Sequence, residues 1–143
     1  MAGGRSEVRH GVGVSGGRQR ISSGGPWEVT AGYSRAIVVG DACHVSGTTD
    51  AGPGGPSLNP GDAAAQARAA WGIVGRALTE AGFSLRDVVR TRMYVVSIDD
   101  APAVAAVHGE VFGDIRPAST LVQVAGLMEP SLLVEVEADA RRG

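Results

Sequence analysis

A strict alternation of apolar and acidic residues near the C-terminal end is the feature that most constrains the fold. In residues 132–140 the even-numbered positions are Leu, Val or Ala, whereas Glu135, Glu137 and Asp139 occupy odd-numbered positions. A period of two predicts a β-strand with one face against a core. Residues 119–124 show the same period, so we predict two strands joined by a short loop. The acidic face is either solvated or lines a cleft that uses an acid, and the pattern leaves both interpretations open.

Periodicity elsewhere in the chain predicts the remaining elements. Strands over 35–39 and 42–48 flank a Gly-Asp pair that is typical of a hairpin turn. Apolar residues at helical spacing predict helices over 62–81 and 99–112, with a strand over 88–97 between them. The order β-β-α-β-α-β-β predicts an α+β fold with both helices on one face of a mixed sheet. The second face is left uncovered, which indicates association with another subunit.

The N-terminal residues differ in composition from the rest of the chain. Residues 1–20 are rich in Gly and Arg and poor in large apolar side chains, so we expect a flexible tail followed by a single domain over 21–143. Residues 11–16 match G-x-G-x-x-G. No strand is predicted before this motif and no helix after it, which argues against a nucleotide-binding loop.

Composition excludes several classes of function. The net charge of −2 and the lack of a basic, aromatic-interleaved stripe argue against nucleic acid, a nuclease activity or an anionic membrane. No apolar run is long enough to span a membrane. All 13 basic residues are Arg, and without Lys a Schiff-base mechanism is excluded. The lone cysteine, Cys43, suits a reducing cytoplasm, where we place the protein. The scattered histidines predict no metal site.

Several stretches, in this order and at this spacing, resemble the Rid family, also called YjgF or L-PSP. They are Y-S-R-A at 33–36, V-S-G-T at 45–48, Q-A-R at 66–68, D-V-V-R-T at 87–91, F-G at 112–113 before R-P-A at 116–118, and L-V-E-V-E-A at 133–138. The resemblance implies a chorismate-mutase-like fold and a homotrimer with clefts between subunits. It also implies hydrolysis of small enamines or imines to a ketoacid and ammonia, without metal or cofactor.

The resemblance also implies roles for individual residues. The family's cleft tyrosine falls on Tyr33, its strand serine on Ser46, and its water-positioning glutamate on Glu135. Gly47 and Thr48 continue the serine strand and would line the same cleft. Trp27 would wall the cleft beside Tyr33, although either aromatic side chain could instead cap the edge of the core.

Two positions depart from the family pattern. The arginine that binds the substrate carboxylate is replaced by Ser119, and a helix asparagine by Ala105. Ser offers one neutral donor in place of two charged ones, a loss on the order of 1.5–3 kcal/mol. Either another arginine enters the cleft, with Arg92 the first candidate and Arg116 the second, or the substrate is not an amino-acid-derived imine.

Two further residues are candidates for contacts with the substrate. Thr120 would donate a hydrogen bond, and His108 is either a helix-surface histidine or a proton shuttle near neutral pH. The sequence therefore predicts a Rid-type enzyme that hydrolyses or tautomerises a small enamine, imine or related substrate. The alternative is a non-catalytic trimer that binds a small ligand or has a regulatory role.

Overall fold

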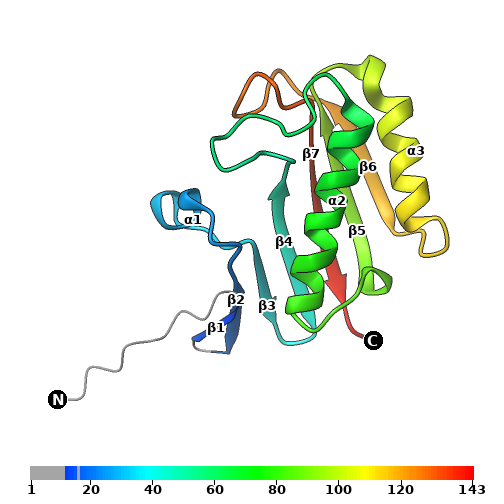
Figure 1. The fold of residues 1–143 in the computed structure, drawn as a ribbon. Helices are drawn as coiled ribbons and strands as arrows, with labels where there is room; N and C mark the ends of the chain where they lie inside the picture. Colours follow the sequence, from blue (N-terminus) through cyan, green and yellow to red (C-terminus); the bar gives the residue numbers. More distant parts are fainter. Residues whose placement is uncertain (1–11, 16) are drawn as a thin grey trace.

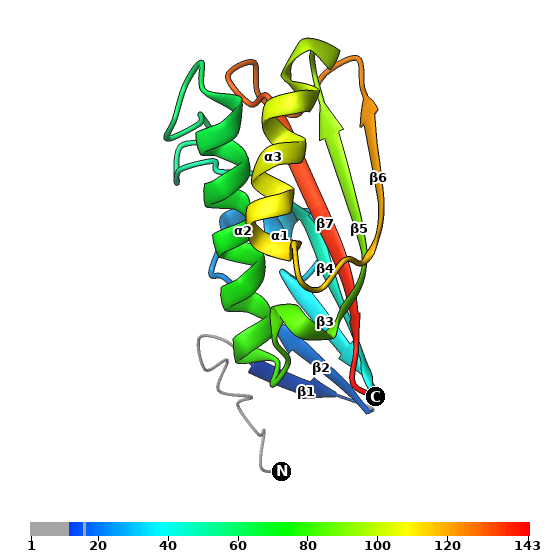
Figure 2. The same ribbon diagram turned by 90° about the vertical axis from the view of Figure 1, so that its right-hand side faces the viewer.

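The computed structural model describes residues 12–15 and 17–143, which form a helical layer on a mixed sheet. The strand order is β1-β2-β3-β4-β7-β5-β6, and in the described part of the chain only β5 and β6 pair in parallel. Helices α2 and α3 lie on one face of the sheet (Figures 1 and 2). The elements are β1 Val12–Ser15, β2 Arg18–Ile21, α1 Pro26–Ala31, β3 Ala36–Val39, β4 Ala42–Thr48, α2 Ala63–Glu80, β5 Val88–Val95, α3 Ala101–Phe112, β6 Ala118–Gln123 and β7 Val134–Arg141, with short 3₁₀ turns at Leu85–Asp87 and Ile98–Asp100.

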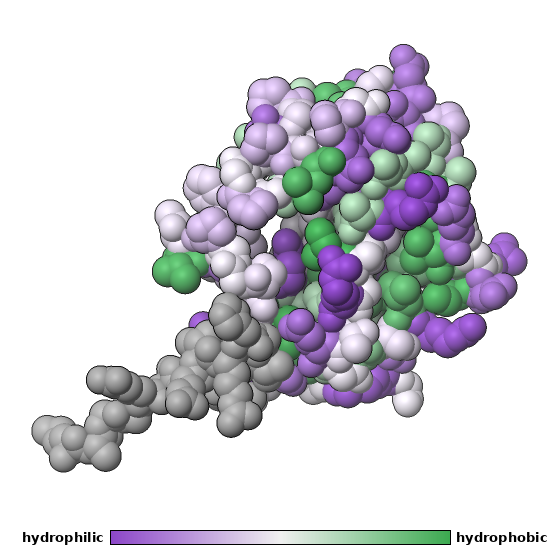
Figure 3. All heavy atoms as spheres, in the orientation of Figure 1, coloured by the Kyte–Doolittle hydropathy of each residue, from purple (hydrophilic) through white to green (hydrophobic). Residues whose placement is uncertain are grey.

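The expected α+β architecture with two helices on one face of a mixed sheet is confirmed. The alternation in β7 has the predicted effect, because its even-numbered residues from Val134 to Ala140 are buried under the helices. The odd-numbered acidic residues lie on the opposite side, which we call the open face. On the helical side, hydrophilic and hydrophobic surface is mixed in small areas (Figure 3).

Two expectations about the strands are wrong. The first concerns part of the expected flexible tail over residues 1–20, because residues 12–15 and 18–21 form the hairpin of β1 and β2, and β2 pairs antiparallel with β3. The described strands are short and flanked by glycine, and Ile21, at 1% exposure, is the large apolar anchor of β2. β2 satisfies its backbone groups on the edge of β3 and β1 satisfies its own on β2, pairings that the hydrophobic pattern of the sequence does not reveal. Residues 1–11 and 16, including two glycines of the G-x-G-x-x-G motif, lie outside the described residues.

The second is the expectation that the last two strands of the chain pair with each other. They are β6 and β7, and β5 lies between them in the sheet. A strand that follows a crossover helix runs parallel to the strand before that helix, so α3 brings β6 alongside β5. The loop after β6 then returns the chain to the gap between β4 and β5, where β7 pairs antiparallel with both.

A buried amide fixes the start of β7. Gln66 of α2 is fully buried, and its Nε2 donates to the carbonyl oxygens of Asn59 and Ser131 at 3.1 and 3.0 Å. Its Oε1 accepts from the Leu133 amide at 2.8 Å. A buried amide with its hydrogen bonds satisfied specifies one arrangement of the chain around it. Gln66 thereby fixes the backbone at Leu133, which lies two residues before Glu135.

Candidate functional site

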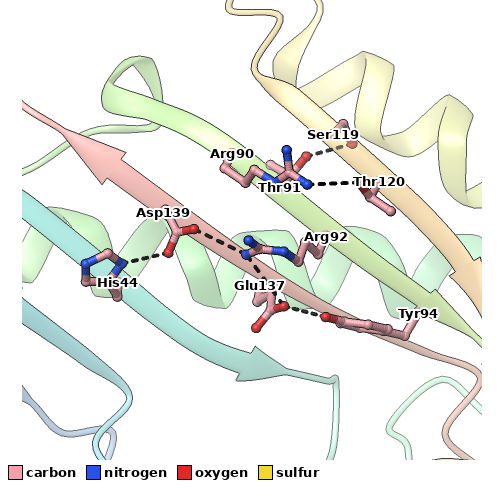
Figure 4. Close-up of polar contacts among 9 residues, drawn as sticks. All are labelled: His44, Arg90, Thr91, Arg92, Tyr94, Ser119, Thr120, Glu137 and Asp139. Carbon is pink, nitrogen blue, oxygen red and sulfur yellow. Dashed lines mark hydrogen bonds and ion pairs between the residues drawn. The ribbon is translucent and has the colours of Figure 1, made fainter.

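A row of polar side chains crosses the open face from β4 over β7 to β5 (Figure 4). His44 Nδ1 lies 2.7 Å from Asp139 Oδ1, and the other Asp139 oxygen accepts from Arg92 at 3.2 Å. Arg92 also lies 3.8 Å from Glu137, which accepts a hydrogen bond from the Tyr94 hydroxyl. Two of the three carboxylates of β7 are therefore held by partners on the neighbouring strands.

Arg92 is engaged within this row. Its guanidinium lies between Asp139 and Glu137, with a side chain that is 39% exposed. An anionic ligand at Arg92 would have to compete with both carboxylates. The second candidate, Arg116, lies in the connection before β6 with an exposed side chain and a left-handed backbone (φ 54°).

Glu135 differs from the other two acids of β7. Its side chain packs over Gly47 so closely that a Cβ at Gly47 would lie 2.6 Å from Glu135 Oε2. Among the described residues, none donates a hydrogen bond to its carboxylate. Burial raises the pKa of Glu135, as does the charge of Glu137, whereas Arg35 lowers it. A partly buried carboxylate with a raised pKa and free oxygens is suited to proton transfer.

Arg35 is the residue beside Glu135 that the sequence analysis missed as a site residue. Its Nη2 donates to the Gly47 carbonyl oxygen, and its Nε is buried without a partner among the described residues. Burial lowers the pKa of Arg35, while Tyr33, Glu28 and Glu135 raise it. The sequence did offer one sign of this role: Arg35 directly follows Tyr33 and Ser34, in the Y-S-R-A stretch that resembles the family.

The predicted aromatic wall is exposed. Trp27 of α1 is 61% exposed and Tyr33 is 42% exposed, so the alternative in which they cap the core edge is wrong for Trp27. Glu28 fixes this segment, since its carboxylate accepts from the Ser23 hydroxyl at 2.6 Å and its carbonyl oxygen accepts from the Tyr33 amide. Burial opposes ionisation of Glu28, but the hydrogen bonds from the neighbouring serines outweigh it and lower its pKa.

The predicted hydroxyls of β4 are committed to the protein's own backbone. Ser46 Oγ donates to the Ser34 carbonyl oxygen at 2.6 Å, and Thr48 Oγ1 donates to the Ser46 carbonyl oxygen at 2.7 Å. Thr48 is 1% exposed, so it supports the strand rather than lining a surface. The Ser46 oxygen keeps the capacity to accept a hydrogen bond. We call Tyr33, Arg35, Ser46, Gly47 and Glu135 the Glu135 cluster.

A second polar group lies on the helical side of the sheet, at the β6 edge. Thr91 of β5 donates to Ser119 Oγ at 2.8 Å and lies 2.8 Å from His108 Nε2 on α3. The His108 ring packs against Trp71 and Phe112. We call Ser119, Thr91 and His108 the Ser119 chain. Thr91 was missed because its strand position belongs to the core face, where an apolar residue is expected.

Within one chain, the two groups lie on opposite sides of the sheet. Glu135 is on the open face, and so is Thr120, which accepts a hydrogen bond from Arg90 at 3.2 Å. Ser119 and His108 are on the helical side, with the buried Thr91 between them. The structure therefore places these predicted site residues in separate groups on opposite faces of one sheet.

Candidate metal ligands are scattered over the part of the chain that the structure describes. Its His, Cys, Asp and Glu side chains form no group of three that could hold a metal ion. None of its helices is both long enough and apolar enough to cross a membrane. The Cys43 thiol lies in the core, where burial raises its pKa to about 11.

The fold, with two helices on one face of a mixed sheet, can be compared with the folds and sequences of known protein families. Residues 26–142 match the family model described as endoribonuclease L-PSP. The chain belongs to this family, which is the Rid or YjgF family.

The relatives of this chain include proteins named as deaminases. The chain is 35% identical to the 3-aminoacrylate deaminase RutC of Acinetobacter baylyi, over 74% of this chain and 83% of that protein. It is 32% identical to the 2-iminobutanoate/2-iminopropanoate deaminase of Rattus norvegicus, over 88% and 91%. The crystal structure of a YjgF/YER057c/UK114 family member from Mycobacterium tuberculosis superimposes with a TM-score of 0.80 at 45% identity, over 87% of this chain and 99% of that one.

Proposed function

We propose that the protein hydrolyses a small enamine or imine, releasing ammonia, in a cleft formed between copies of the chain. Glu135 is the main support for this proposal. It is a partly buried carboxylate with a raised pKa and free oxygens, whereas the other two carboxylates of β7 have partners on neighbouring strands. The deaminase relatives support the reaction class. The single buried cysteine is compatible with action in a reducing cytoplasm.

The chemistry required is the movement of a few protons. An enamine becomes an imine when its carbon gains a proton and its nitrogen loses one. Water then adds to the imine carbon, and the C–N bond breaks to give a carbonyl and ammonia. Glu135 orients the water and takes its proton, a role that contributes about 10²–10⁴ in rate. Arg35 beside it favours the ionised carboxylate.

The site needs a second copy because its two halves lie on opposite sides of one sheet. A homotrimer in which the open faces meet would place the Glu135 cluster of one copy beside the β6 edge of the next. Each cleft would then use Glu135 from one copy and Ser119 from its neighbour. The uncovered charged row on β4, β7 and β5 would be buried or paired in the same association.

A second candidate function is ligand binding without turnover. It is favoured by Ser119, which offers a neutral donor, and by Arg92, which is already paired with two carboxylates. Neither provides a free guanidinium for a substrate carboxylate. Equilibrium binding of an imine-derived acid, with the ligand recovered unchanged by mass spectrometry, would support this function.

The test is ammonia release from imines generated in the assay by an amino-acid oxidase. We expect release above the buffer rate with the wild type and loss of that increment with Glu135→Ala. The matched control is Glu137→Gln, which changes the next acid on the same face. Rates that equal the buffer rate for the wild type would rule out the deaminase function.

A further inference from the structure

Arg35 is a half-buried arginine that forms no ion pair with the described residues. We propose that Arg35 binds the negatively charged group of the substrate from the Glu135 side of the cleft, and so selects anionic substrates. The inference rests on the proposed function, because it assigns a further substrate-binding residue to the same site. It goes beyond that function by giving Arg35 a role that neither Ser119 nor Arg92 is free to fill.

A comparison with Arg92 shows what Arg35 lacks. The Arg92 guanidinium lies 3.2 Å from Asp139 and also pairs with a second carboxylate (Figure 4). The Arg35 guanidinium instead donates from Nη2 to the carbonyl oxygen of Gly47, which is a neutral acceptor. Burial of a guanidinium without a counter-charge is unfavourable, and burial lowers the pKa of Arg35. The site therefore holds a cation whose balancing anion is none of the described side chains.

The Arg35 guanidinium keeps donors for such an anion. Arginine carries five N–H donors in a planar fork, and one of those on Nη2 is used by Gly47. Nε is buried without a partner among the described residues. Nη1 also has no partner among them but is not buried, so a ligand can reach it. The two terminal nitrogens lie side by side at a spacing that matches the two oxygens of a carboxylate.

Gly47 sets the place of this cation relative to Glu135. The Gly47 carbonyl oxygen accepts from Arg35, and the Glu135 carboxylate packs over the position where a Gly47 side chain would begin. Burial raises the pKa of Glu135 and the charge of Arg35 lowers it, although the two groups form no ion pair. An anion bound to Arg35 would thus lie beside a carboxylate whose oxygens remain available.

Binding of an anion at Arg35 must change the basicity of Glu135. The anion offsets the positive charge of Arg35, so the pKa of Glu135 rises and its carboxylate becomes a stronger base once the substrate is in place. The coupling is reciprocal, so the anion binds more weakly when Glu135 is ionised. The other titratable groups of the neighbouring elements are Glu28 and Tyr33 before β3, His44 of β4, Tyr94 of β5 and Glu137 of β7.

The experiment compares the binding of propanoate with that of propanamide, its neutral analogue. Neither is an enamine or imine, so binding is measured without turnover. We expect Arg35→Gln to weaken propanoate binding about tenfold or more, because a charged hydrogen bond is lost, and to leave propanamide binding unchanged. Arg35→Lys keeps the charge but not the fork, so its loss should be smaller. Arg92→Gln is the matched control and should change propanoate binding by no more than about threefold, as for a partly exposed ion pair.

A second measurement uses the unchanged chain and so does not depend on how well the variants fold. The carboxyl carbon of Glu135 is followed by NMR over a pH titration, and propanoate, but not propanamide, should raise the Glu135 pKa. Equal weakening of both ligands in Arg35→Gln, full propanoate affinity in that variant, or a Glu135 pKa that propanoate leaves unchanged would overturn the inference. Because both measurements are of binding, a failed ammonia assay leaves their outcome intact.

Discussion

Glu135 and the pair Glu137–Asp139 lie on one face of one strand, yet their surroundings are opposite in kind. Glu137 and Asp139 are held by Tyr94, Arg92 and His44 from the adjacent strands. Glu135 has glycine beneath it and a guanidinium nearby, with no hydrogen bond to its carboxylate from the described residues. A shared sequence pattern therefore covers two environments of a carboxylate: Glu137 and Asp139 are paired with neighbouring side chains, and Glu135 accepts no hydrogen bond from the described residues.

The largest expected difference is between two isosteric substitutions. Glu135→Gln should lower kcat/KM for imine hydrolysis by about 10²–10⁴, because it removes the group that takes the proton from water. Glu137→Gln should change kcat/KM by only a few-fold, because Glu137 contacts Tyr94 and Arg92 rather than the substrate. Steady-state kinetics on both variants checks this, and equal losses would erase the distinction between the two acids.

The second prediction concerns the glycine under Glu135. Gly47→Ala places a Cβ where Glu135 Oε2 now lies, at 2.6 Å, so the carboxylate must move. We expect a loss of roughly 10- to 100-fold in kcat/KM, since misplacement of a catalytic group by about an ångström is costly. Gly109→Ala on α3 is the control, because nothing lies within 4 Å of its added Cβ. Full activity of Gly47→Ala would show that the position of Glu135 does not matter.

The third prediction uses the free energy of unfolding. Burial raises the pKa of Glu135, so its protonation favours the folded state at low pH, and this contribution is lost as pH rises through the folded-state pKa. At neutral pH the ionised group opposes folding. Glu135→Gln should therefore raise the free energy of unfolding at pH 7 by up to about 1 kcal/mol, with little gain near pH 4.

Glu137→Gln sharpens this prediction, since it loses a hydrogen bond and an ion pair and should lower the free energy of unfolding at pH 7. Urea titrations at both pH values measure the two variants. If Glu135→Gln destabilised the protein at pH 7 as Glu137→Gln does, Glu135 would be a structural carboxylate like its neighbours.

The smallest expected effect belongs to Arg92. Arg92→Gln leaves Asp139 and Glu137 without their cation, at a cost of about 0.5–1 kcal/mol for partly exposed ion pairs. We expect KM to change by no more than a few-fold. An increase in KM of tenfold or more, specific to carboxylate-bearing substrates, would instead make Arg92 the substrate's cationic partner.

The sequence was informative wherever a local period reflects burial. The alternation in β7 correctly separated the buried even-numbered residues from the acidic open face, and the apolar spacing located α2 and α3. It was not informative about β2, whose only large apolar residue is Ile21 and whose partners come from another strand.

The arrangement of the candidate site depends on long-range topology and so could not be read locally. Ser119 lies on the opposite face from Glu135 because α3 brings β6 alongside β5, in a register that sets Ser119 beside the core-facing Thr91. Thr91 occupies a core position that favours an apolar residue, and its hydroxyl is explained only by the two partners that the fold supplies. Arg35 is in contact with Gly47 because β3 and β4 are neighbours.

The central claim is that one site takes Glu135 from one copy and Ser119 from another, and mixed assemblies test it most directly. Glu135→Gln and Ser119→Asp chains, each inactive alone, are co-expressed with different tags and the mixed oligomer is isolated. In a three-membered ring with heterologous contacts, each mixed oligomer has both native residues in one of its three clefts, or about a third. We predict recovery of about that fraction of the wild-type rate of ammonia release. A mixed oligomer no more active than its parents would contradict a site shared between copies.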